Sequence, residues 1–331
     1  METRTVADED AGSRVDRWFR RHYPALPFGQ VARLLRTGQV RVDGRRVKAG
    51  TRLEAGQSVR VPPLPESAAT PAPHAGPGPA EGPTKGPDPA AVAALQDAVL
   101  YRDAWVLALN KPPGLATQGG TGVRDSVDSL AESLRFGAPA RPRLVHRLDK
   151  DTSGVLILGR SAAAADALAH AFRGRSAHKI YWALIAGHLK PRAGCIDRPI
   201  AKHTRGSGEK MTLDPGGKTA QTAYATLTTT RSGISWVALS PLTGRTHQLR
   251  VHMAALGTPI LGDGKYGGRA AFPEALPVDR LQLHAREIAV PHPEDGTTLR
   301  LSAPLPPAMA AAFATLGLDP AHGEGLDPAP A

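Results

Sequence analysis

An aspartate stands among basic side chains in the segment HRLDKDTSG, residues 146–154. Asp149 lies between Arg147 and Lys150, and the apolar run GVLILG that follows predicts a buried strand. The strand anchors the backbone, while the aspartate side chain can reach a cleft. Nearby cations favour the charged form of a carboxylate. Such a group can be a metal ligand, half of a surface ion pair or a nucleophile. Asp151 competes for the same role, although an aspartate in a turn can also bond local backbone amides.

Two further segments carry side chains suited to a buried site. In GRTHQLRVHMAALGTPILGD, residues 244–263, helical spacing lets Arg250 project beside the apolar face, where a guanidinium needs a carboxylate partner. We expect Asp149 to be that partner. In AHKIYWALIAGH, residues 177–188, Tyr181 leads into an apolar strand. A tyrosine in that place is more often part of a core than catalytic.

The charge of the chain indicates a polyanionic partner. The formal net charge is +11 and the pI is about 10.1, so nucleic acid is the first candidate and an anionic membrane surface the second. No run reaches about 18 consecutive apolar residues, so no membrane span is expected. The single cysteine cannot form an internal disulfide, and the start METRTVADEDAG has no apolar signal segment. We expect a cytoplasmic protein.

Metal and nucleotide sites are not predicted. One cysteine and 12 dispersed histidines give no zinc pattern. His247 and His252 lie five residues apart and do not share a helix face, which favours structural or RNA-contacting roles. No phosphate-binding loop of the Walker type and no glycine triplet after a strand is present.

Residues 13–63 predict a small basic unit. Helical spacing covers 13–23 and 28–38, and a hairpin with a turn at Asp43–Gly44 and a final strand follow. This unit contains twelve Lys and Arg against three Asp and Glu, which is +9 of the total +11. It is therefore a candidate polyanion-binding module.

The rest of the chain divides by composition. Residues 64–93 are rich in proline and glycine and are expected to form a flexible linker. Residues 94–318 alternate hairpin-joined strands with inserted helices, which predicts a mixed α+β domain with a largely antiparallel sheet. Residues 319–331 are expected to be a disordered tail.

The small basic unit resembles a known module. Its two helices, the hairpin TGQVRVDGRRVK and the strand LEAGQSVRV are similar to the alpha-L RNA-binding module, the type named after the fourth small-subunit ribosomal protein. The resemblance covers residues 13–63.

The larger unit resembles the RluA-type pseudouridine synthases over about residues 97–306. The segments HRLDKDTSG, KIYWALIAG and GRTHQLRVHMAALGTPILGD carry the resemblance in that order, together with LNKPPGL and LQLHAREIAVPHP. The stretch QGGTG, residues 118–122, is similar to the subgroup that acts on large-subunit ribosomal RNA. Members of that subgroup often have HGG there, so Gln118 departs from their pattern.

The resemblance implies a reaction and a role for four residues. Members of the family isomerise uridine to pseudouridine in RNA: the base is detached from the ribose, turned and rejoined through ring carbon five. Asp149 matches the catalytic aspartate, which attacks either the sugar or the base. Arg250 matches the arginine that pairs with it. Tyr181 matches the active-site tyrosine, which stacks beneath the base or moves the proton from carbon five. Arg147 matches the residue that enters the RNA stack as the uridine leaves.

We therefore expect site-specific pseudouridine formation in large-subunit (23S) ribosomal RNA. RNA contacts are expected from Arg147 and from cations of the basic unit, namely Arg33, Arg36, Arg41, Arg45, Arg46 and Lys48. The reaction needs no redox step, group donor or energy source, so no cofactor and no metal are expected. The alternatives are the same chemistry on transfer RNA, a non-catalytic RNA-binding ribosome-assembly factor and a DNA-binding regulator. We expect a monomer whose partner is RNA, not DNA or a membrane.

Overall fold

The computed structural model describes residues 2–23, 26, 28–64, 88–120, 125–174, 176–205 and 208–328. The chain forms two compact units, Met1–Lys85 and Gly86–Ala331. Within the described ranges, no helix is both long enough and apolar enough to cross a membrane.

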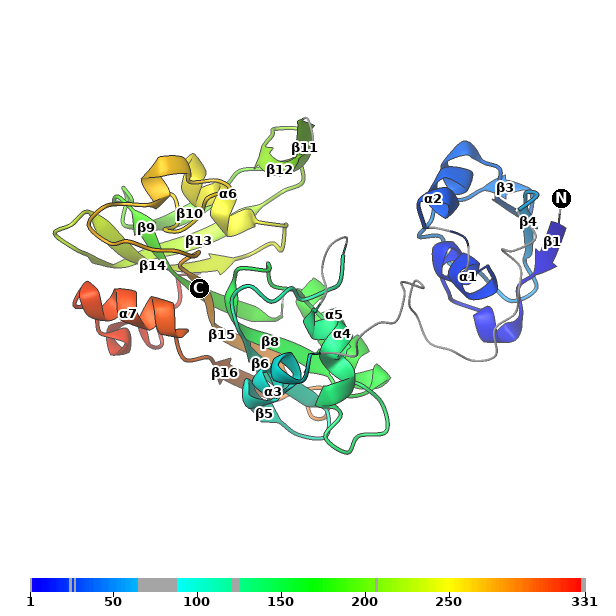
Figure 1. Ribbon diagram of the computed structural model, residues 1–331, viewed down its shortest axis with the longest axis horizontal. Coiled ribbons are helices and arrows are strands. Elements are labelled where there is room, and N and C mark those ends of the chain that lie inside the picture. Colours follow the sequence, from blue (N-terminus) through cyan, green and yellow to red (C-terminus); the bar gives the residue numbers. More distant parts are fainter. Residues whose placement is uncertain are drawn as a thin grey trace. The chain divides into compact units, whose positions relative to one another are not determined.

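The first unit is a four-stranded sheet packed with two helices (Figure 1). The strand order is β1-β4-β2-β3, and Trp18 and Phe19 fill the core between the helices and the sheet. The unit starts before residue 13, because the first strand pairs with the last from Glu2↔Val61 to Thr5↔Ser58. Its elements are β1 (Glu2–Thr5), η1 (Asp8–Asp10), α1 (Val15–His22), α2 (Phe28–Thr37), β2 (Arg41–Val42), β3 (Arg45–Arg46) and β4 (Ser58–Val61).

The second unit is built on one long sheet of order β10-β13-β14-β9-β15-β8-β6-β5, with β16 on β15 and β7 on β8. Its strands are β5 (Val99–Arg102), β6 (Val106–Lys111), β7 (Arg143–Leu144), β8 (Ser153–Gly159), β9 (His178–Ala186), β10 (Ala193–Asp197), β13 (Gln221–Thr229), β14 (Ile234–Pro241), β15 (Leu283–Pro291) and β16 (Thr298–Ser302). Every pairing is antiparallel except that of β15 with β8. The predicted mixed, largely antiparallel α+β fold is therefore confirmed.

Helices and one extra hairpin surround this sheet. They are α3 (Pro89–Asp97), α4 (Val127–Leu130), η3 (Ala131–Leu134), α5 (Ala162–Gly174), the hairpin β11 (Ile200–Arg205) and β12 (Gly208–Leu213), α6 (Gln248–Ala255), η4 (Gly268–Ala271), α7 (Pro307–Thr315) and η5 (Pro320–Gly323). Helix α5 lies against β8, whereas α6 lies with β13 and β14 in the other half of the unit (Figure 1).

Strand β8 is buried at every residue because both faces of the sheet are covered there. Leu156 and Leu158 pack on one face with Leu130, while Val155 and Ile157 point to the other face, toward α5. Such two-sided burial explains why the sequence GVLILG is a continuous apolar run and does not alternate. The strand gives a rigid base to the loop that precedes it.

Two further predicted boundaries differ from the structure. Helix α3 covers the last five residues of the predicted linker 64–93, because Asp88 Oδ1 caps it by accepting from Ala90 N at 3.0 Å and the helix buries Leu95. Residues 65–87 of that linker lie outside the described residues. The predicted tail 319–331 begins with η5, where Gly323 packs so closely that an added Cβ would lie 2.4 Å from the Trp236 ring. Residues 329–331 lie outside the described residues.

Candidate active site

Asp149 lies on the loop between β7 and β8, and the backbone is held on both sides of it. Thr117 Oγ1 donates to Leu148 O at 2.8 Å and accepts from Leu148 N at 3.1 Å. Lys111 Nζ donates to Lys150 O at 3.0 Å. The Asp149 side chain keeps an exposed fraction of 18%. Neighbouring segments therefore fix the backbone of this loop, while the Asp149 carboxylate remains partly exposed to solvent.

Lys111, at the end of β6, helps to hold the Asp149 loop, and the sequence did not point to it. Its side chain is fully buried, and its ammonium donates to three backbone carbonyls, those of Pro112, Leu115 and Lys150, at 2.8, 2.9 and 3.0 Å. Burial lowers its pKa to about 7, although the charges of two nearby aspartates act in the opposite direction. The position of this lysine at the end of the apolar strand VLALNK was a signal that its ammonium is buried and binds the backbone of a neighbouring loop.

Arg250, on α6, has a different main partner from the one predicted. Its Nε and Nη2 donate to Asp263 Oδ2 and Oδ1 at 2.8 and 2.7 Å, a paired contact between buried side chains. Its Nη1 lies 4.0 Å from Asp149 Oδ2, too far for a hydrogen bond. The predicted pair of Arg250 with Asp149 is therefore present at 4.0 Å, but Asp263, to which the sequence did not point, is the closer partner and takes the edge of the guanidinium that binds two oxygens at once.

Asp263 is buried, and both of its carboxylate oxygens accept hydrogen bonds. Besides the guanidinium, its Oδ1 accepts from Lys265 N and Tyr266 N, each at 3.1 Å. Burial acts to lower the pKa of Arg250, but the hydrogen bonds and charge of Asp263 outweigh it and raise that pKa. Asp263 thus holds the guanidinium in place, with its remaining edge toward Asp149.

His247 also faces Asp149, and its role was left undefined by the sequence. It precedes α6 in the left-handed region, with φ 55°, which turns its ring toward the loop. Its Nε2 lies 3.9 Å from Asp149 Oδ1, and its Nδ1 lies 2.6 Å from Tyr266 Oη. Burial is the largest influence on the pKa of His247 and lowers it, so the ring beside the carboxylate is neutral near pH 7.

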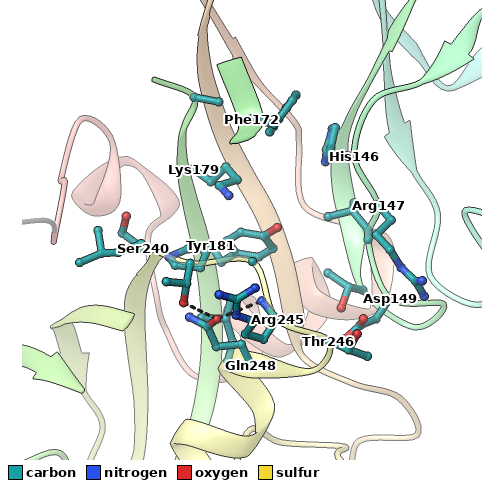
Figure 2. Close-up of a pocket in the computed structure, with 18 of the residues that line it drawn as sticks. His146, Arg147, Asp149, Phe172, Lys179, Tyr181, Ser240, Arg245, Thr246 and Gln248 are labelled. Atoms are coloured by element: carbon teal, nitrogen blue, oxygen red, sulfur yellow. Dashed lines mark hydrogen bonds between the residues drawn. The ribbon is translucent and has the colours of Figure 1, made fainter. Parts of the chain in front are cut away.

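Asp149 and Tyr181 line a cavity of about 810 Å³, shown in Figure 2. Tyr181 projects from β9 with its ring in the cavity, and Arg147 stands exposed at the opposite wall. Asp149 is the one acidic side chain among the described residues that line this cavity. Burial, aided by the charge of Asp149, raises the pKa of Tyr181, so its phenol is protonated at neutral pH. The four side chains assigned by resemblance, Arg147, Asp149, Tyr181 and Arg250, therefore meet at one cavity.

A second hollow of about 550 Å³ lies on the other side of the Asp149 loop. Asp149, His247 and Arg250 contribute to both hollows, whereas Asp151 and Lys150 line only the second. Of the two aspartates in HRLDKDTSG, Asp149 is thus the one that reaches the cavity with Tyr181.

The predicted RNA-contacting cations of the first unit lie on α2 and on the hairpin that follows it. Asp43 and Gly44 have φ 48° and 77°, which confirms the predicted two-residue turn. Arg46 Nη2 donates to Thr37 O at 3.0 Å and so ties the hairpin to the end of α2. The exposed members are Arg33, Arg36, Arg45, Arg46 and Lys48, while Arg41 is half-buried. We call these six residues the α2–hairpin surface.

No group of three or more metal-ligating side chains occurs in the described part of the chain. His252 is buried, with Nδ1 2.9 Å from Thr222 Oγ1 and Nε2 3.0 Å from Arg198 O. Its expected structural role agrees with these contacts.

Comparisons with known proteins identify the family. A family model for RNA pseudouridylate synthase matches residues 105–255. The ribosomal large subunit pseudouridine synthase C of Vibrio cholerae is 37% identical over 90% of this chain and 91% of its own, and that of Escherichia coli K12 is 35% identical over 91% and 92%. The structure of human RNA pseudouridylate synthase domain containing 4 matches with a TM-score of 0.59 and 30% identity, over 70% of this chain and 97% of that one. The chain is therefore a member of the RNA pseudouridylate synthase family, an enzyme that makes pseudouridine in RNA.

Proposed function

We propose that this enzyme isomerises specific uridines of large-subunit ribosomal RNA, with Asp149 as the catalytic carboxylate. The observation that carries the assignment is Asp149, the one acid among the described residues that line the cavity, which faces Tyr181 and lies 4.0 Å from a guanidinium that is hydrogen-bonded to Asp263. The RNA target is supported by the relatives at 35–37% identity, which are named for the large ribosomal subunit.

The first step is extrusion of the target nucleotide. A base inside folded RNA must leave its stack before its glycosidic bond can be reached, which costs a few kcal/mol. Arg147 stands exposed at the wall of the cavity, where its planar guanidinium can stack in the vacated place and contact phosphate. Arg147 therefore offsets part of the cost of extrusion.

Cleavage of the glycosidic bond then needs a negative charge. Cationic character develops at the sugar, and a carboxylate stabilises or captures it, as in retaining glycosidases. Asp149 must stay ionised when the bound RNA displaces water from the cavity, a costly demand for an isolated charge. The positive charge of Arg250, 4.0 Å away, stabilises the ionised form of Asp149. Because its paired edge is occupied by Asp263, it does not cover the oxygens of Asp149.

Tyr181 supports the base through its ring. The raised pKa of its phenol disfavours the phenolate that would be needed to remove the proton from carbon five. Of the two roles considered, stacking beneath the detached base is the one that we propose. The ring lies in the cavity near Asp149, so a base held on it can turn without leaving the site.

We further propose that the enzyme acts as a monomer in the cytoplasm, on RNA and not on DNA or membranes, without a cofactor. One chain supplies every residue named in the mechanism, and the isomerisation has no net redox change or group donor. The α2–hairpin surface supplies phosphate contacts away from the target uridine.

The test is pseudouridine mapping in a strain that lacks this gene, complemented with wild type, Asp149→Asn or Asp151→Asn. We expect large-subunit ribosomal RNA sites that vanish in the deletion, return with wild type and with Asp151→Asn, and stay absent with Asp149→Asn. The Asp151 variant is matched in charge and lies two residues away. Restored sites with Asp149→Asn would remove the carboxylate from the mechanism, and lost sites confined to transfer RNA would overturn the ribosomal target.

A further inference from the structure

We propose that Lys179 binds a backbone phosphodiester group that flanks the extruded uridine. The inference rests on the proposed function, since it concerns the same RNA in the same cavity. It gives a substrate contact to a cation that the mechanism above does not use.

Lys179 shares a wall of the cavity with Tyr181. The two residues are two positions apart on β9, so their side chains leave the same face of the sheet, and both line the cavity. In Figure 2, Tyr181 lies between Lys179 and Asp149. Two residues of a strand span about 6.6 Å. A strand of RNA whose base contacts Tyr181 therefore brings its sugar–phosphate backbone within reach of the lysine.

The ammonium of Lys179 has no anionic partner among the residues that the structure describes. Its surroundings are the Phe172 ring, 6.0 Å from Nζ, and the His146 ring, which is stacked on Phe172. The His146 ring is neutral, because its Nε2 accepts from Ile157 N at 2.9 Å. In the described part of the chain no carboxylate pairs with Lys179, and burial alone lowers its pKa.

A partly buried charge without a partner favours an anionic ligand. A neutral carbonyl of a base supplies an acceptor but no charge, whereas a phosphodiester supplies both and forms charge-assisted hydrogen bonds. Among the other cations of the cavity, Arg250 is paired with Asp263, Arg245 donates to Thr219 O at 2.9 Å, and Arg147 and Arg173 are exposed. Lys179 differs from them because it is partly buried beside Tyr181, and as a compact charge with three donors it fits a phosphate anchor there.

The experiment couples a protein change to a chemical change in the substrate. An RNA oligonucleotide carries the uridine located by the mapping above and, one at a time, a neutral methylphosphonate at each of the two linkages that flank it or at a linkage far away. Wild type, Lys179→Met and Lys179→Arg are compared by kcat/KM. Lys218→Met serves as the matched control, because that lysine is exposed and lies outside the cavity lining. Thermal unfolding checks that each variant folds.

Loss of one charged hydrogen bond predicts a fall in kcat/KM of about 10- to 100-fold for Lys179→Met on natural RNA, with most activity kept by Lys179→Arg and by the Lys218 control. A methylphosphonate at one of the flanking linkages should lower the kcat/KM of wild type by a similar factor. The same methylphosphonate should lower the kcat/KM of Lys179→Met by less than about threefold, because the variant has already lost the contact. If the methylphosphonate lowers the kcat/KM of Lys179→Met as much as that of wild type at both flanking linkages, the two effects are independent and the proposal is overturned. Failure of the proposed ribosomal target is distinct, since it shows as no wild-type turnover on natural RNA.

Discussion

At the scale of single residues, the centre of the site is a guanidinium between two carboxylates with unequal contacts. Asp263 holds the Nε–Nη2 edge of Arg250 at 2.7 to 2.8 Å, whereas Asp149 lies 4.0 Å from Nη1. A buried cation needs a partner, and Asp263 provides it. Asp149 is consequently close enough to be stabilised by the positive charge, yet its oxygens are not used up in a direct ion pair. This division leaves a carboxylate that can meet the sugar or the base.

We predict that Asp263→Asn lowers kcat by about 10- to 100-fold while KM changes less than about threefold, because the variant loses one charged acceptor and lets Arg250 move onto Asp149. Tritium release from RNA labelled at uridine carbon five measures the rate, and thermal unfolding measures stability. Asp166→Asn, on the exposed side of α5, is the matched control. An unchanged kcat for a folded Asp263→Asn enzyme would show that the contact of Asp263 with Arg250 does not affect the reaction.

The sequence led to Asp149, Tyr181, Arg250 and Arg147 through long motifs, and all four meet at the cavity. It did not lead to Asp263, His247 or Lys111 as site residues. Their roles depend on which side chains approach across loops, such as the contact of Arg250 with Asp263 rather than with Asp149. The spacing of residues along a helix or strand predicts which face a side chain lies on. It does not predict which of several acidic residues will pair with a buried arginine.

At the scale of elements, the Asp149 loop depends on how closely β8 meets β15. Their parallel pairing joins His284↔Ser153 and Ala285↔Gly154, four and five residues after Asp149. Gly154 has φ 111°, and an added Cβ would lie 2.2 Å from Ala285 O. A side chain there must push the strands apart, which explains the glycine that ends HRLDKDTSG.

We predict that Gly154→Ala destabilises the second unit by more than about 3 kcal/mol, or misplaces the Asp149 loop and abolishes turnover, because strain from the close backbone contact adds to that of a positive φ. Gly233→Ala is the matched control: its φ is 79°, but nothing lies within 4 Å of the added Cβ. Denaturant unfolding and tritium release test both variants. Equal losses in the two would contradict a special role for the approach of β8 to β15.

Elements set by local rules were predictable, and long-range pairings were not. The run GVLILG predicted β8, and Asp43–Gly44 predicted the hairpin of the first unit. The pairing of β8 with β15 joins residues 131 positions apart, and that of β1 with β4 closes the first sheet from outside the predicted range 13–63. Neither pairing has a local signature.

At the scale of the whole molecule, two buried histidines link folding to pH. His284 accepts from Ser153 Oγ at Nδ1 and donates from Nε2 to Ala303 O, and His146 accepts from Ile157 N, so both rings are neutral. Burial lowers the pKa of His284 to about 4 and that of His146 to about 3. In an unfolded chain both titrate near 6.5. The unfolded state therefore binds more protons between pH 6.5 and about 3.

We predict that the free energy of unfolding falls by several kcal/mol as the pH drops from 6.5 to about 4, since stability rises with pH wherever the unfolded state binds more protons. Urea unfolding at several pH values measures the change. The variant His284→Gln should be less stable at pH 7 but should lose less on acidification than wild type. Parallel curves for the two proteins would mean that His284 does not cause the acid sensitivity.

We propose that both units bind RNA. The first unit carries +9 of the formal +11 charge within residues 13–63, and its α2–hairpin surface exposes Arg33, Arg36, Arg45, Arg46 and Lys48. Each phosphate contact releases condensed counterions, so the salt dependence of affinity counts the contacts. The cavity of the second unit contributes its own cations near the target uridine.

We predict that removing residues 1–63 weakens binding to a ribosomal RNA fragment and reduces the slope of log Kd against log salt by about 3 to 5, because up to six phosphate contacts are lost at roughly 0.7 to 0.9 each. Anisotropy titrations at several salt concentrations give the slope. Replacing the five exposed cations of the α2–hairpin surface by glutamine in the full chain should have nearly the same effect, whereas Arg17→Gln with Arg20→Gln, on α1, should change the slope by less than about 1. An unchanged slope after removal would show that the first unit does not touch RNA.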